Sequence, residues 1–123
     1  MSVFRRIVVI LIASAFLFAG MARGNTRERA EAQRLVKAMD ESYNEGDWNV
    51  CLDRVHEFFR LYYEEDDPEN ARDMTYAYIM LGNVHVGFAD YVSGDKYYTR
   101  GLAVARKWKQ GENELKCLGN LAV

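Results

Sequence analysis

Proline and cysteine are scarce in this sequence. Of its 123 residues, one is a proline, Pro68, and two are cysteines, Cys51 and Cys117. Because proline interrupts helices, its scarcity and the abundance of good helix formers favour a helical chain. The two cysteines are far apart and match no metal-binding spacing. We therefore expect them to be small buried residues rather than metal ligands or a disulfide pair.

The side chains that usually perform catalysis are also few. His56 and His85 are the only histidines. His56 adjoins Glu57, but no third ligand follows at metal-binding spacing, and Ser42 and Ser93 have no companion base nearby. The sequence has neither a glycine-rich phosphate loop nor an HExxH motif. We expect no enzyme activity, no cofactor and no bound metal, with His85 packed between helices.

The chain carries little net charge. The formal value is −2, and loss of Arg5 and Arg6 with a cleaved leader would leave −4. Phosphate binding requires a basic surface, so a nucleic acid is not an expected partner. The acidic run at residues 64–67 lacks the alternating ligands and the central glycine of a calcium loop. It predicts a solvated joint between helices.

A long hydrophobic run occurs once, at residues 7–19. Arg5 and Arg6 precede it, and the small residues Gly20 and Ala22 follow it. This pattern is typical of a secretory signal peptide at residues 1–22, and we expect cleavage after Ala22. The run is short for a membrane-spanning helix, which needs about 20 apolar residues. The expected location is therefore periplasmic or secreted; the alternative is an uncleaved leader that anchors the chain to the membrane.

Five helices are expected after the leader, because apolar residues recur there at steps of three or four. Asn25, with Glu28 three residues later, is the expected start of the first helix. The later joints are marked by residues that cap, begin or break helices. These joints are Gly46-Asp47, Asp67-Pro68, Ala89-Asp90 and Gly111.

Each expected helix has an apolar face that should pack against its neighbours. The fifth, beginning near Glu112, includes Leu115 and Leu118. The faces of the other four helices are Ala32, Leu35, Val36, Met39 and Tyr43; Cys51, Leu52, Val55, Phe58, Phe59, Leu61 and Tyr62; Met74, Ala77, Tyr78, Leu81, His85 and Phe88; and Tyr91, Gly94, Tyr98, Gly101, Leu102 and Ala105.

The sequence contains an internal repeat. The segment LGNV at residues 81–84 recurs as LGNL at residues 118–121, a period of 37 residues. A fixed period of 20–50 residues indicates an array of stacked units. The segment from Tyr78 to Leu102 resembles a tetratricopeptide repeat (TPR). The residues that carry the resemblance are Tyr78, Leu81, Gly82, His85, Asp90, Tyr91, Gly94, Tyr98 and Gly101.

The resemblance implies antiparallel helical hairpins stacked as a right-handed solenoid. In such an array Gly82 would let two helices approach closely, and Gly94 and Gly101 would stand where a neighbouring helix leaves no room. The first hairpin matches less closely, and the third repeat is only half present. We expect residues 25–123 to form one domain of about two and a half repeats, the N-terminal part of a longer array. A helical bundle without true repeats is the alternative.

TPR arrays bind peptides or partner domains in a concave groove lined by the first helix of each hairpin. The resemblance thus implies a non-catalytic scaffold with a protein or peptide partner, and its unpaired last helix could support self-association. The negative charge of Asp40 argues against the class that clamps a C-terminal carboxylate. The alternative function is the sensory N-terminal domain of a larger membrane-bound signalling protein, such as a sensor kinase or a transcriptional regulator. The residues carried over to the groove are Asp40, Tyr43, Tyr76, Ile79, Asn83, Lys116 and Asn120.

Overall fold

A computed structural model of the chain describes residues 28–61 and 68–121. The predicted leader at residues 1–22 and the predicted helix start at Asn25 lie outside the described residues. Contacts divide the chain into two units, Met1–Glu31 and Ala32–Val123, and the second holds the core discussed below. The described residues form helices and turns without a strand, which confirms the all-α class. None of the described helices combines the length and apolar character needed to cross a membrane.

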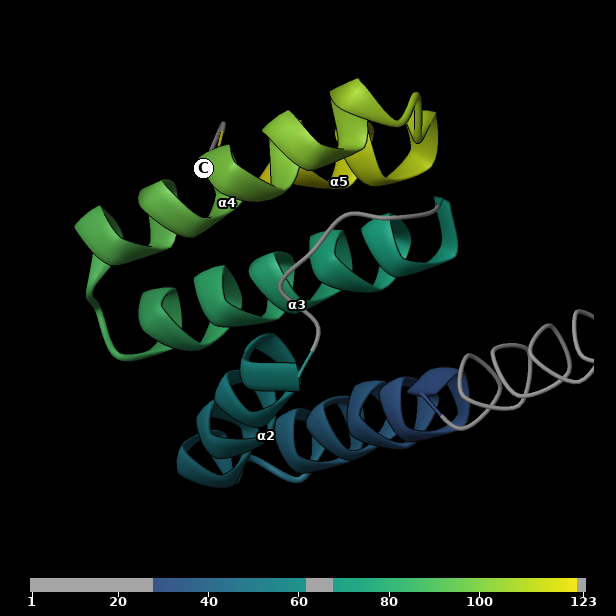
Figure 1. Cartoon of the computed structure of the whole chain (residues 1–123). Helices are drawn as coiled ribbons and strands as arrows, with labels where there is room; N and C mark the ends of the chain where they lie inside the picture. The colour runs from purple at the N-terminus through teal and green to yellow at the C-terminus, as the bar shows by residue number, and fades with distance from the viewer. Residues whose placement is uncertain (1–27, 62–67, 122–123) are drawn as a thin grey trace, which may run out of the picture. The chain divides into compact units, whose positions relative to one another are not determined.

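The helices follow the joints expected from the sequence. The first helix covers residues 28–44. Pro68 begins a helix, as predicted. The last helix was expected to begin near Glu112, after a break at Gly111, but Gly111 is itself its first residue. In Figure 1, α3 and α4 run side by side in opposite directions, and α5 packs against both. The labelled helices are α2 (Trp48–Leu61), α3 (Pro68–Gly87), α4 (Tyr91–Lys107) and α5 (Gly111–Leu121).

The turns after the first helix, α3 and α4 share one hydrogen-bonded geometry. In each, two successive backbone amides donate to carbonyls of the preceding helical turn, as in a Schellman motif. The left-handed position is held by Gly46 (φ 78°), Ala89 (φ 62°) and Lys109 (φ 54°). Glycine adopts this conformation readily, but alanine and lysine do so at a cost. After Ala89, Asp90 caps α4, where its Oδ1 accepts a hydrogen bond from the Ser93 amide at 3.2 Å.

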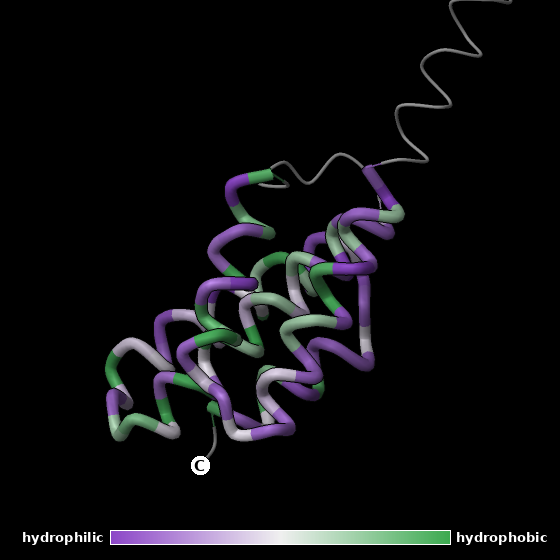
Figure 2. The backbone as a smooth tube through the Cα atoms, turned by 90° about the horizontal axis from the view of Figure 1, so that it is seen from below, coloured by the Kyte–Doolittle hydropathy of each residue, from purple (hydrophilic) through white to green (hydrophobic). Residues whose placement is uncertain are grey.

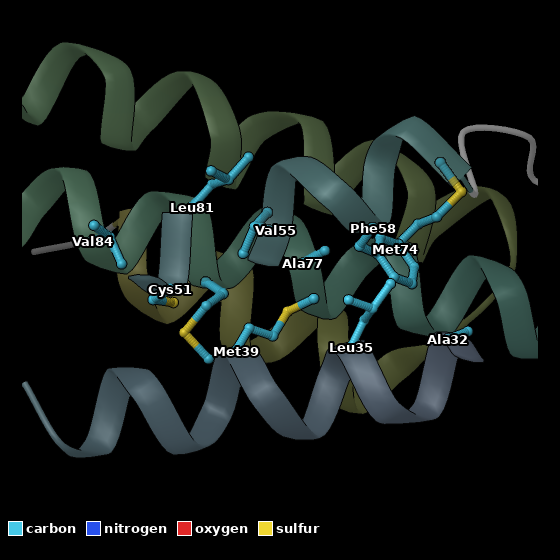
Figure 3. Close-up of a cluster of buried hydrophobic side chains, with 11 residues drawn as sticks. Ala32, Leu35, Met39, Cys51, Val55, Phe58, Met74, Ala77, Leu81 and Val84 are labelled. Atoms are coloured by element: carbon cyan, nitrogen blue, oxygen red, sulfur yellow. The ribbon is translucent and has the colours of Figure 1, made fainter. Parts of the chain in front are cut away.

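The main core lies where the first helix, α2 and α3 meet (Figure 3). Leu35 and Phe58 are fully buried there, and burial of such a side chain contributes about 1.5–3 kcal/mol. The predicted apolar faces of these three helices are therefore largely confirmed. The buried members of this cluster are Ala32, Leu35, Met39, Cys51, Val55, Phe58, Met74, Ala77, Met80, Leu81 and Val84.

Helix α3 is buried on more sides than its apolar stripe predicts. One side faces the main core, and another packs Ile79 against Leu102 of α4 and Cys117 of α5. Thr75 is also fully buried, and its hydroxyl donates to the Ala71 carbonyl at 2.9 Å. α3 is thus the central helix of the described unit, with neighbours on opposite sides. In Figure 2 polar and apolar residues alternate along the helices.

Helices α3 and α4 approach closely at glycines. A Cβ atom on Gly82 would overlap the ring of Tyr98, with Cζ only 2.8 Å away. A Cβ on Gly94 would lie 2.6 Å from Cγ2 of Val86, and one on Gly101 would lie 3.2 Å from Cβ of Tyr78. Separations below 3.0 Å cannot be kept without movement of a neighbour. The predicted role of the glycines in close helix packing is confirmed.

Five residues placed in the predicted apolar faces are exposed, among them Leu118 at 39%. Phe88 is 48% exposed and Tyr91 is 63% exposed, because they flank the turn between α3 and α4 rather than facing the core. Leu61, the last residue of α2, is 51% exposed. On α5, Leu115 is 71% exposed, whereas Cys117 is fully buried. The side of α5 that packs is therefore the Cys117 side and not the Leu115 side.

Candidate partner-binding face

The first helix and α3 are joined by a short polar contact. The Tyr76 hydroxyl donates to Oδ1 of Asp40 at 2.6 Å. The other oxygen of the same carboxylate accepts a longer bond, at 3.4 Å, from the Asn44 side chain. Both Asp40 and Tyr76 are partly buried, so the bond lies at the edge of the core. Two residues predicted to share a groove are thus in direct contact.

Asn83 connects α3 with α4 and α5. Its Oδ1 accepts a 2.6 Å hydrogen bond from the Tyr98 hydroxyl of α4. The same oxygen lies 3.5 Å from Nδ2 of Asn120 in α5. Asn83 and Asn120 are separated by one repeat period and occupy the same place in the LGN segment. The repeat therefore brings equivalent amide side chains together.

These contacts define a row of polar side chains across three helices. Tyr76 and Asn83 are seven residues apart on α3, two helical turns, so they project from the same side of that helix. Tyr76 reaches Asp40 of the first helix, and Asn83 reaches Asn120 of α5. We call Asp40, Tyr76, Asn83 and Asn120 the polar row. All four are only partly buried, which leaves polar atoms within reach of a ligand.

Tyr43 and Lys116 extend this face at its two ends. Tyr43, three residues after Asp40, is partly buried, and its ring stacks near Trp48 with centroids 6.4 Å apart. Lys116, four residues before Asn120, pairs with Glu112 at 3.2 Å, and its side chain is 52% exposed. Asp40 thus places a carboxylate at one end of the face, and the Glu112–Lys116 ion pair lies at the other end.

The two tyrosine hydroxyls in this region are held in the protonated, hydrogen-donating form. Burial raises the pKa of Tyr76 well above its ordinary value, and the hydrogen bond to the Asp40 carboxylate raises it further. Burial also raises the pKa of Tyr98, with smaller contributions from Tyr43 and Asp95. At neutral pH both groups act as fixed donors, so Asp40 and Asn83 are held in one orientation.

Ile79 is the exception among the residues carried over from the resemblance. It is 6% exposed and packs with Leu102 and Cys117. By the repeat period, Ile79 on α3 corresponds to Lys116 on α5. Lys116 faces solvent, whereas the equivalent side of α3 is covered by another helix. The expectation that Ile79 lines an open groove is wrong, because α4 and α5 cover it.

The histidine and cysteine side chains have structural surroundings. His85 stacks on Tyr97 with ring centroids 5.3 Å apart, and its Nδ1 lies 3.4 Å from Oδ2 of Asp90, as expected for a histidine packed between helices. Cys51 and Cys117 are buried free cysteines, as predicted, and burial raises the pKa of both thiols. A raised pKa lowers the fraction of reactive thiolate. Among the described residues, no group of three acidic, histidine or cysteine side chains is placed to hold a metal ion.

One polar residue with several contacts escaped prediction. The Gln110 side chain donates to the Pro68 carbonyl at 3.2 Å, and its Oε1 accepts from Asn113 at 3.2 Å. The Thr75 hydroxyl lies 3.4 Å from the same Oε1. Gln110 therefore ties the α4–α5 turn to the start of α3. Its position after the left-handed Lys109 matches that of Asp90 after Ala89, which is the sequence signal for its location.

The aromatic residues around the α3–α4 turn form a second unexpected contact. Trp48 packs edge-on against Phe88 with centroids 5.4 Å apart. Its ring also lies against Gly87, where a Cβ atom would come within 2.8 Å. Trp48 follows the Gly46-Asp47 joint, as Tyr91 follows Ala89-Asp90, but Tyr91 is 63% exposed.

No protein-family model, curated protein or solved structure matches this chain.

Proposed function

We propose that this chain is a non-catalytic protein-interaction module that binds a segment of a partner protein along the polar row. In this proposal its helices are TPR-like hairpins, stacked so that the first helix of each hairpin contributes to one shared face. The first helix, α3 and α5 are those helices. The proposal includes export, which is supported by the signal-like pattern at residues 1–22.

The observation that carries the proposal is that two hydrogen-bonded pairs join three helices along one side of α3. Asp40 contacts Tyr76, and Asn83 contacts Asn120. Packing of the core does not by itself require carboxylate, phenol and amide groups at these partly exposed positions. A line of this kind is suited to recognition, because exposed polar groups fix the register of a bound segment.

The chemistry of the row indicates the kind of segment it would bind. An asparagine side chain offers both donors and an acceptor, which matches the backbone of an extended peptide. Asp40 at one end attracts a cation, and Lys116 at the other can exchange its exposed partner Glu112 for an anion of the ligand, because such a surface pair is weak. We therefore expect a segment with a basic residue near its Asp40 end and an acidic residue near its Lys116 end. Opposite charges would give it one orientation.

Peptide selection followed by charge variants tests this function. Peptides selected from a random display library for binding to the full chain should carry basic and acidic residues at opposite ends. Asp40→Asn keeps the acceptor for Tyr76 and removes the charge, and Lys116→Gln removes the opposite charge. Each should weaken peptide binding by up to about fivefold, because an exposed charge pair contributes up to about 1 kcal/mol.

Arg60→Gln is the matched control, because Arg60 is an exposed cation at the end of α2 and lies off the row. It should leave the affinity unchanged. Equal affinities for the parent chain, Asp40→Asn and Lys116→Gln would show that the peptides bind elsewhere. Failure of the library to yield any binder would also contradict the proposal.

A further inference from the structure

Two cations lie over one aromatic ring on the exposed side of α4. Nζ of Lys96 is 5.5 Å from the centroid of the Tyr97 ring, and Cζ of Arg100 is 5.7 Å from the same centroid. The Tyr97 ring is partly buried, packs against the main core and stacks on His85. Lys96 and Arg100 are both exposed. The fold thus holds the ring in place, and the ring positions two exposed cations near each other.

No described carboxylate neutralises these two cations. Some exposed cations of this chain do have such a partner, as Lys37 has in Glu41 at 3.7 Å. Lys96 and Arg100 form no ion pair within residues 28–61 and 68–121, where the Tyr97 ring is their neighbour instead. Contact with an aromatic face is weak at an exposed site, and it leaves N–H donors of both cations available to an anion.

An exposed valine continues the line of the two cations. Val92, Lys96 and Arg100 follow one another at four-residue steps, so they form one line along α4. Val92 is 84% exposed, which leaves its side chain available for contact. We call Val92, Lys96, Tyr97 and Arg100 the α4 stripe. It presents one apolar group and two positive charges at intervals of one helical turn.

The α4 stripe is separate from the polar row. Tyr97 stacks on His85, whereas Tyr98, the next residue of α4, bonds to Asn83 of the row. His85 follows Asn83 by two positions, about 200° around α3, so the stripe and the row lie on different sides of that helix. Burial raises the pKa of Tyr98, and the charge of Asp95, the only acidic residue of α4, raises it further. That carboxylate therefore acts on the Tyr98 side of α4.

We propose that the α4 stripe binds an acidic helix of a partner protein. Two carboxylates of that helix pair with Lys96 and Arg100, and an apolar side chain lies on Val92. Side chains at four-residue steps on the partner reproduce the spacing of the stripe, because both elements are then helices with the same rise per turn. A polyanion such as a nucleic acid fits less well, since the chain as a whole is negatively charged and the stripe offers only two cations.

Within this sequence no acidic segment can take the place of the partner. Residues 1–27 and 122–123 contain no aspartate or glutamate, which leaves the acidic run at residues 64–67. That run is joined to Pro68, and its members are at most four positions away, about 14 Å of extended chain. His85, beside the stripe, is about 26 Å from Pro68 along α3. The run is too short to lie along the stripe, so the matching negative charge comes from a separate protein.

A designed peptide tests the α4 stripe. It is an alanine-rich helix with one leucine and two glutamates at successive four-residue steps, and it is titrated into the ¹⁵N-labelled full chain at low salt. We expect saturating chemical-shift changes at Lys96, Tyr97 and Arg100, and we expect the affinity to fall in high salt. The same peptide with glutamine in place of both glutamates should bind about tenfold more weakly, because it keeps the leucine but loses both charges.

Single charge variants of the full chain locate the contact. Lys96→Gln and Arg100→Gln should each weaken binding of the peptide about threefold to fivefold, the effect of losing one exposed charge pair. Both side chains are exposed, so neither change should unfold the chain. Arg72→Gln is the matched control, because it removes one exposed cation near the opposite end of α3. It changes the net charge equally and should leave the affinity unaltered.

Any of four results would overturn the proposal. Two of them are the absence of saturating shifts and equal affinities for the parent chain, Lys96→Gln and Arg100→Gln. An equal loss in Arg72→Gln would show an effect of net charge alone. Tighter binding of a short oligothymidylate at the same residues would assign the stripe to nucleic acid. These variants do not alter the polar row, so failure of one proposal leaves the other standing.

Discussion

Gly82→Ala adds one methyl group at the closest approach of α3 and α4. In a solvent-exposed helix this change stabilises by about 0.5–1 kcal/mol, because alanine is the better helix former. At Gly82, however, the new atom would overlap the Tyr98 ring. Overpacking of this kind costs about 1–3 kcal/mol. If the ring moves away instead, its hydroxyl loses the 2.6 Å bond to Asn83, which is worth about 1 kcal/mol. We expect a net destabilisation of about 1–2 kcal/mol.

Gly119→Ala is the internal control for this prediction. It makes the same substitution at the same place in the repeat, but nothing lies within 4 Å of the added atom. It should therefore stabilise the chain by about 0.5–1 kcal/mol. Urea unfolding of the full chain, followed by circular dichroism, measures both variants. Opposite signs support the packing described for α3 and α4, whereas two stabilised variants, or two equal changes, would refute it.

Three further predictions address the turns, the polar row and the leader. Ala89→Gly should raise the free energy of unfolding by about 0.5–1 kcal/mol, since glycine relieves the left-handed conformation; an unchanged urea midpoint would contradict this. Tyr76→Phe should lower it by about 1 kcal/mol at pH 8 through loss of the bond to Asp40. Because the pKa of Tyr76 is raised in the folded state, its protonated form stabilises the fold below pH about 10, and this contribution is lost above that pH. An alkaline decline in the free energy of unfolding that is equally steep in Tyr76→Phe would count against the bond. Finally, the exported chain should lack residues 1–22 by mass spectrometry, and recovery of the uncleaved mass would favour the anchor.

The helices and their joints were predictable from the sequence because the signals are local. A residue that caps a helix acts on amides two or three positions away, as Asp90 does on Ser93. Pro68 begins α3 for a similarly local reason. The close approach at the glycines lies between helices and was implied by the resemblance to a repeat. The caps and helix starts depend on neighbours along the chain, so the sequence contains most of the information they require.

Exposure was less predictable, because it depends on which helices lie beside each face. Leu81 and Leu118 occupy the same place in the LGN repeat, yet the first is buried and the second is partly exposed. The difference arises because Leu81 packs into the main core with the first helix and α2, whereas Leu118 belongs to neither buried cluster of the described residues. Ile79 shows the reverse effect, since two helices bury a residue expected to be accessible. Periodicity identifies an apolar face but does not show whether another element covers it.

The residues of the polar row were predicted individually, but their contacts were not. The resemblance placed Asp40, Tyr76, Asn83 and Asn120 on a common side of three helices. It did not indicate that the Tyr76 hydroxyl would reach Asp40, or that Tyr98 would orient Asn83 from α4. Such bonds depend on the distance and tilt between helices, which arise from core packing. The row is thus a property of the folded arrangement as well as of the residue types.

Chemical-shift mapping is the most direct test of the proposed binding face. The ¹⁵N-labelled full chain is titrated with a peptide selected from the library, and backbone and asparagine side-chain signals are recorded. The account predicts that the largest changes occur at Asn83, Lys116 and Asn120, with little change at His56 and Arg60 on α2. Saturating binding that shifts the signals of His56 and Arg60 and leaves those of the row in place would contradict it.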